Sequence, residues 1–288
     1  MNKKTLLAIF SGIIILSGCA TQKVVNYPEY KSVATISAST GTVSTVTETP
    51  AEDYLIPNSQ VFVSGRGSDG TVGSMFGAIG AVISTSIDRS RNESAVGDAA
   101  PSLRLKFDSE LTEALKQNLA REPYASKYKT LPSDNASDIK LLPSARFIVL
   151  KDSNAKVSFQ LNARFKDPVQ GDEGRKAYSY SSEGFRKFSG ENGWADNNSA
   201  QLKEAAHRAF ERLSWVFIQD LAGEFSAQMA TEKQQLIRWR VAGNPQLVTS
   251  VLLREHPDYF VVVPMLNDKP NMNLITVVER SLVKVEAR

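Results

Sequence analysis

The chain has 288 residues, and 42% of them are hydrophobic, which is enough to build a sizeable core. Its 34 basic and 31 acidic side chains give a formal net charge of only +3, and no concentrated basic stripe follows the sequence, so nucleic acid is excluded as a partner. The single cysteine, Cys19, excludes a disulfide framework within the chain.

The first nineteen residues have the layout of a secretory signal. Lys3 and Lys4 form a short basic start, and the uncharged stretch 5–16 that follows is short for a membrane span. This stretch ends in Leu16-Ser17-Gly18-Cys19, which resembles the lipobox of bacterial lipoproteins: an aliphatic residue, two small residues and a cysteine. The alternative is an uncleaved anchor helix with an incidental cysteine.

The lipobox resemblance implies a specific processing of the amino terminus. Residues 1–18 would be a signal peptide, cleaved before Cys19, and the thiol of Cys19 would carry a diacylglyceryl group beside an acylated amino terminus. Several acyl chains anchor a protein stably to a lipid bilayer. In lipoproteins of enteric-type bacteria, the absence of aspartate at position 20, here Ala20, implies the outer membrane, with the domain in the periplasm.

Residues 19–58 are rich in Ser, Thr and Val and show no strong helical pattern, so we expect a tether between the membrane and the domain. A random coil of this length has an end-to-end distance of roughly 35 Å. The alternative is an edge strand, because Val, Ile and Thr favour extended backbone.

A first strand is expected at 61–63, and it runs into Gly65-Arg66-Gly67-Ser68-Asp69-Gly70, which matches G-x-G-x-x-G. We reject a dinucleotide site there, because Asp69 would place a negative charge among phosphate-facing amides and the following pattern does not alternate strand and helix. No cofactor is therefore expected.

The uncharged stretch 71–87 is the most unusual one inside the chain. Small residues recur along it and would let two helices approach closely, which makes it a candidate assembly surface. The alternatives are membrane contact, a hydrophobic surface for another partner, and a helix packed in the protein's own core. The residues of the candidate surface are Gly73, Gly77, Gly80 and Ala81.

Clearer patterns follow in the next hundred residues. Leucine and phenylalanine every four residues from Leu103 to Leu119 predict an amphipathic helix that starts near Ser102 and ends before Pro123. Alternating apolar residues predict three antiparallel strands, at 145–150, 157–165 and 176–183, with one face toward solvent.

The last third of the chain predicts one long helix and further strands. Trp194 lies in a polar loop, where it could anchor a partner or cover the end of a core. The helix should run from about Ser199 to Glu232. Strands are expected at 247–253, 259–263 and 274–285, and they could complete the same sheet or form a small second unit.

No catalytic constellation is recognisable. The only histidines are His207 and His256, no cysteine remains after acylation, and no metal-spaced cluster occurs, so we expect neither an enzyme nor a metal site. A hydrolase with two carboxylates stays open as an alternative, because spacing alone cannot pair two acids across a cleft.

The order of elements predicts an α+β fold: a mostly antiparallel sheet with two or three helices on one face and additional C-terminal strands. We expect a domain at 59–240 and a C-terminal β extension at 241–288. Over 59–232 the order is similar to the periplasmic domains of the curli-secretion-channel subunit and of lipoprotein activators of peptidoglycan synthases. It implies a non-catalytic lipoprotein that assembles with envelope proteins or with itself; the alternative is a module that binds a ligand or peptidoglycan.

Overall fold

The structure is a computed structural model, and it describes eleven stretches of the chain. They are residues 25–41, 53–64, 92–121, 123–149, 154–166, 171–181, 184–230, 235–241, 248–266, 269–271 and 273–286. The expected signal peptide, Cys19, the glycine motif at 65–70 and the candidate assembly surface (Gly73, Gly77, Gly80 and Ala81) lie outside the described residues.

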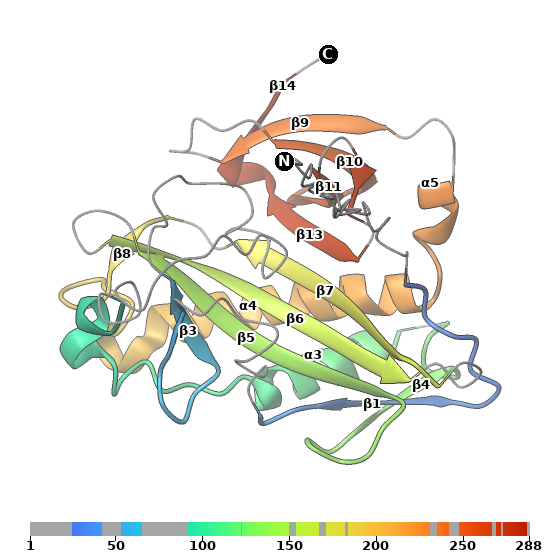
Figure 1. Ribbon diagram of the computed structural model, residues 1–288, viewed down its shortest axis with the longest axis horizontal. Helices are drawn as coiled ribbons and strands as arrows, with labels where there is room; N and C mark the ends of the chain where they lie inside the picture. Colours follow the sequence, from blue (N-terminus) through green and yellow to red (C-terminus); the bar gives the residue numbers. More distant parts are fainter. Residues whose placement is uncertain are drawn as a thin grey trace, which may run out of the picture.

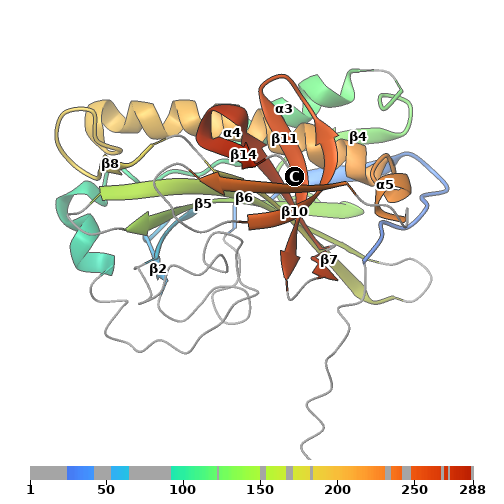
Figure 2. The ribbon, with the colours of Figure 1, turned by 90° about the horizontal axis from the view of Figure 1, so that it is seen from above.

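The described residues form one large mixed sheet and a small set of helices (Figures 1 and 2). The strands are β1 (Ala34–Ala38), β2 (Tyr54–Leu55), β3 (Val61–Ser64), β4 (Tyr128–Leu131), β5 (Ile139–Val149), β6 (Asn154–Lys166), β7 (Glu173–Ser181), β8 (Arg186–Lys187), β9 (Leu236–Val241), β10 (Val248–Glu255), β11 (Tyr259–Leu266), β12 (Lys269–Pro270), β13 (Leu274–Glu279) and β14 (Val283–Glu286). The helices are a turn at 92–96, the 3₁₀ turns η1 (Gly97–Ala99) and η3 (Arg280–Leu282), α3 (Asp108–Leu119), α4 (Asp196–Leu221) and α5 (Ser226–Ala230).

The sheet follows the order β14-β9-β10-β11-β13-β7-β6-β5-β1-β4, with β3 also paired to β5. Most neighbouring pairs are antiparallel; β1 runs parallel to β4 and β5, β3 runs parallel to β5, and β13 runs parallel to β7. Helices α3 and α4 pack on one face of this sheet, as Figure 2 shows edge-on. The expected α+β class, with a mostly antiparallel sheet and helices on one face, is confirmed.

The expected tether at 19–58 is wrong for its described part. Strand β1 lies inside the sheet between β5 and β4, and residues 54–55 form the short strand β2 against β3. Ala34, Ile36 and Ala38 are buried, so this stretch contributes to the core rather than leading to it. The composition permits both outcomes, because Val, Ile, Thr and Ser suit an exposed coil as well as a strand.

The three-strand meander at 139–181 is confirmed, and β6 buries the apolar residues predicted for it. Its second face is less wet than expected, because Arg146 on β5 and Lys156 on β6 are also buried. Arg146 pairs with Asp53, with 2.9 Å between Nη1 and Oδ2. The segment that leads into β2 thus neutralises one of the charges on this face.

Both long helices are shorter than expected. Helix α3 begins at Asp108 rather than near Ser102 because Gln60 binds the preceding backbone: its N–H donates to the carbonyl of Leu105 (2.8 Å), and its Oε1 accepts from the N–H of Phe107 (2.6 Å). Helix α4 ends at Leu221 rather than near Glu232, because Gly223 adopts a left-handed conformation (φ +78°) that typically terminates a helix.

The C-terminal strands complete the same sheet through the parallel pair β13–β7. The expected boundary between residues 240 and 241 falls inside β9, a strand that the sequence pattern did not predict. Trp239 on β9 packs with Phe260 and Val262 in a small second core, separate from the main one. The C-terminal part is therefore not a unit with its own sheet.

Candidate functional site

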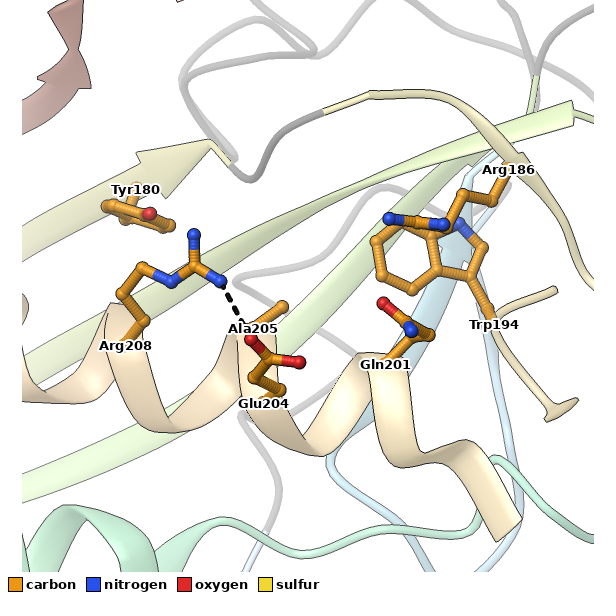
Figure 3. A pocket seen from close by; sticks show the side chains of 7 residues that line it. All are labelled: Tyr180, Arg186, Trp194, Gln201, Glu204, Ala205 and Arg208. Atoms are coloured by element: carbon orange, nitrogen blue, oxygen red, sulfur yellow. Dashed lines mark hydrogen bonds and ion pairs between the residues drawn. The ribbon is translucent and has the colours of Figure 1, made fainter. Parts of the chain in front are cut away.

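A small cavity lies between the first half of α4 and the strands β7 and β8 (Figure 3). Its volume is about 130 Å³. Four lining residues come from one face of α4, at the i, i+3, i+4 and i+7 spacing that places side chains on the same side of a helix. The lining residues are Tyr180, Arg186, Trp194, Gln201, Glu204, Ala205 and Arg208.

The cavity carries an excess of positive charge. Arg208 pairs with Glu204 at 3.3 Å, and both side chains are substantially exposed. Arg186 lies over the ring of Trp194, 5.6 Å from its centroid, and its Nη1 donates a long hydrogen bond of 3.5 Å to the carbonyl of Asn192. It pairs with no carboxylate among the described residues. The Gln201 side chain has no hydrogen-bond partner in the described part of the chain. The uncompensated charge of Arg186, with its remaining N–H donors, and the amide of Gln201 are thus available to a ligand.

Trp194 is part of the core and is not the exposed partner anchor that the sequence could suggest. The residue is only 2% exposed, and its indole N–H donates to the carbonyl of Ala155 at 2.9 Å. Its ring packs against Phe147, with 5.7 Å between centroids. The partner-anchor interpretation is therefore wrong, and the alternative is correct: Trp194 covers the end of the core and forms one wall of the cavity.

A second polar network connects the cavity wall to the C-terminal strands. The hydroxyl of Tyr180 donates to Oε1 of Glu279 on β13 at 2.6 Å, and Arg212 on α4 pairs with the same carboxylate. Arg212 also lies over the ring of Tyr259 on β11, 4.9 Å from its centroid. The late strands thus help to position the side of α4 that lines the cavity.

A third cluster is sealed inside the protein. Lys176 on β7 pairs with Asp220 on α4 (2.7 Å), and the hydroxyl of Tyr178 donates to the same carboxylate oxygen (2.6 Å). The hydroxyl of Tyr27 is 2.8 Å from that of Tyr178. Burial, and then the negative charge of Asp220, raise the pKa of both tyrosines well above the usual value, so both hydroxyls stay protonated.

This sealed cluster cannot meet a substrate, because the side chains of Lys176 and Asp220 are only 4% and 2% exposed. It fastens the N-terminal segment to α4 and β7. The two histidines do not belong to this cluster or to the cavity. His207 is exposed on α4, and the ring of His256 stacks on Tyr259 with 4.4 Å between centroids. The structure describes no group of three metal-ligating side chains and no helix long and apolar enough to cross a membrane.

Sequence reasoning missed the cavity residues Arg186, Gln201 and Arg208. The last two lie on the polar side of the predicted long helix, where such residues usually form a solvated surface. Their spacing on one helix face was a visible signal. That face becomes a cavity wall because it lies opposite β7 and β8, and no local sequence pattern indicates this position.

Comparisons with known proteins identify no family and no functional residues for this chain. No family model matches the chain, and no curated protein matches it. Among solved structures, the chain matches protein XCC0632 from Xanthomonas campestris, assigned to DUF330, at 11% identity and a TM-score of 0.29. The match covers 72% of this chain and 96% of that one. A similarity this distant carries no argument about function.

Proposed function

We propose that the protein is a lipid-anchored, non-catalytic lipoprotein of the bacterial outer membrane, with its domain in the periplasm, which assembles with other envelope proteins or with itself. The observation that carries the proposal is the motif Leu16-Ser17-Gly18-Cys19 directly after a short apolar stretch.

The anchor can be tested in a Gram-negative host that is fed a clickable palmitate analogue. The wild-type chain should become labelled and co-sediment with the outer membrane. A Cys19→Ala variant should be unlabelled and keep residues 1–18, because the cleaving peptidase acts on the lipidated cysteine. A wild-type chain that is unlabelled, or that is found in the soluble fraction, would refute the proposal.

Self-assembly is tested by the mass in solution of a soluble form that starts at Ala20. This form keeps β1, which pairs with β4 and β5 and would be lost if the protein were shortened to the expected domain at 59–240. A defined oligomer at micromolar concentration supports self-assembly. A monomer rules out self-assembly, and the proposal is then assembly with other envelope proteins.

A second candidate is a module that binds an envelope ligand, and the cavity favours it. The guanidinium of Arg186, which has no carboxylate partner among the described residues, suits a carboxylate, and the amide of Gln201 suits a peptide group. The walls formed by Trp194 and Ala205 suit a small apolar side chain. A peptide with a free carboxylate, of the kind that cross-links peptidoglycan strands, matches this chemistry.

The second candidate is tested by the binding of the soluble form to intact peptidoglycan sacculi. An Arg186→Gln variant should bind about 10- to 100-fold more weakly, because a hydrogen bond to a charged group contributes about 1.5–3 kcal/mol. Lys203→Ala is the control, since Lys203 is an exposed cation on α4, the helix beside the cavity, but does not line the cavity. Equal binding of the Arg186 variant and the control would exclude the cavity as the site.

A further inference from the structure

The N-terminal segment 25–30 is fastened to the domain before β1 begins. The backbone N–H of Val25 donates to Oδ1 of Asn273 at 3.0 Å. The ring of Tyr27 packs against Phe165, with 4.5 Å between centroids, and against Phe217, with 5.9 Å between centroids. These contacts hold the segment at its first described residue.

The interior also holds Tyr27 through the sealed cluster. Its hydroxyl is hydrogen-bonded to that of Tyr178, and the ammonium group of Lys176 lies 5.0 Å from the centroid of its ring. An aromatic side chain that is packed, hydrogen-bonded and in contact with a buried cation does not exchange freely with solvent. The part of the chain that links the domain to the membrane therefore ends at residue 25.

The link between the acylated cysteine and the domain is short. Five residues separate Cys19 from Val25, and even a fully extended chain spans only roughly 20 Å from the first of these two positions to the second. A flexible chain covers less than its extended length on average. A domain tied to acylated Cys19 in this way stays next to the bilayer, whereas a 39-residue tether would have let it move away.

The sheet topology shows which end of the domain would face the lipid. Val25 binds Asn273, immediately before β13, and β13 starts opposite Ala177 on β7. Ala177 lies midway along β7, and from there the segment runs to Tyr27, which packs on Phe165 near the end where β6 finishes and β7 begins. On the same side β11 turns through β12 into β13. In Figure 1 the blue N-terminal segment runs along this right-hand side of the molecule.

Cations are exposed at this end of the sheet. They are Lys166 at the end of β6, Arg175 at the start of β7 and Lys269 on β12, and we refer to these three residues as the anchor-side cations. Glu173 pairs with Arg175 at 2.9 Å, whereas Lys166 and Lys269 have no carboxylate partner among the described residues. Exposed cations close to a bilayer are attracted to anionic head groups.

We propose that the domain lies against the bilayer with the anchor-side cations in contact with anionic phospholipid head groups. This inference rests on the proposed acylation of Cys19. The lipid chains supply the anchor, and the fastened segment together with Lys166 and Lys269 determines the orientation. The cavity beside α4 and β8 would then be presented away from the lipid, because β8 pairs with the opposite end of β6.

The test uses the mature, lipidated full chain in vesicles that contain anionic phospholipid and a lipid with a nitroxide head group. Cys19 is the only native cysteine, and its sulfur is blocked by the lipid, so a single new cysteine can carry a fluorophore. Asp172→Cys places the fluorophore at the anchor-side end. Lys187→Cys places it beside Asn154, twelve residues along β6 from Lys166 and about 40 Å away.

The fluorophore at position 172 should lose fluorescence on reconstitution, and the one at position 187 should keep it. A variant that carries Lys166→Glu and Lys269→Glu should reduce the loss at 172. Lys203→Glu on α4, with the same charge change per residue, should leave it unaltered. Equal quenching at both positions, or none at either, overturns the orientation when mass spectrometry of the sample shows lipid on Cys19. Absence of lipid on Cys19 overturns the proposed function and this inference with it.

Discussion

The buried pair of Lys176 and Asp220 should be among the most sensitive points of the fold. Nζ and Oδ2 are 2.7 Å apart, and the two side chains are 4% and 2% exposed. Asp220→Asn keeps the shape of the side chain and removes the charge, which leaves the ammonium group of Lys176 buried without a counter-ion. Breaking a buried pair in this way typically lowers the free energy of unfolding by about 3–5 kcal/mol.

The converse substitution, Lys176→Met, should cost a similar amount, because Asp220 would then keep only the hydrogen bond from Tyr178. The double variant removes both buried charges together. It should therefore cost clearly less than the sum of the two single losses, with a coupling free energy of about 2 kcal/mol or more.

Urea denaturation at pH 7, followed by tryptophan fluorescence and by circular dichroism, measures these losses. The pair of Glu204 and Arg208 is the control, because it also joins one carboxylate to one cation, at 3.3 Å, while both side chains are exposed. Glu204→Gln should cost less than about 0.5 kcal/mol. The reasoning is refuted if Asp220→Asn costs as little as Glu204→Gln, or if the two single losses simply add.

Three further predictions concern stability. Burial lowers the pKa of Lys156 to about 8, below the ordinary value of about 10.4 that holds in the unfolded chain. The unfolded state binds more protons between those values, so the free energy of unfolding should rise from about pH 8 to about pH 10. Lys156→Met should abolish this rise in urea titrations. An unchanged pH dependence in the variant would contradict the lowered pKa of Lys156. Trp194→Ala should cost about 3–5 kcal/mol in the same assay, whereas a stable variant that loses only partner binding would restore the anchor interpretation. A Cβ atom at Gly174 would lie 2.4 Å from Cε2 of Phe165, which is buried against Tyr27. Gly174→Ala should therefore lower the melting temperature by an amount equivalent to about 1–3 kcal/mol. An unshifted midpoint in calorimetry would contradict this packing of Gly174 against Phe165.

Some of this architecture could be predicted because it depends on neighbours in the sequence. Strict alternation along 157–165 places its apolar residues on one side of any extended backbone, and β6 buries them. The apolar stripe from Leu202 to Phe225 likewise lies on the core side of α4 and the turn that follows it. In both cases a local period determines which side faces inward.

The helix ends were harder to predict for a definable reason. The apolar period already begins at Leu103, and that residue is indeed fully buried. The backbone nevertheless forms a turn at 101–103 and stays irregular up to Phe107, because the side chain and backbone of Gln60, more than forty residues earlier, occupy its hydrogen-bonding groups. A contact between such distant residues leaves no periodic trace at either position.

The sequence by itself determined the α+β class, the three-strand meander, the apolar face of the long helix and the candidate lipidation motif at Cys19, because each depends on residues within a few positions of one another. Only the tertiary structure decided that β1 belongs inside the sheet, since its partners β4 and β5 are about a hundred residues away. It also decided that Trp194 is core and that Arg186 and Gln201 share a cavity. Pairing between distant strands sets those positions, and its free energy depends on which surfaces meet rather than on any local pattern.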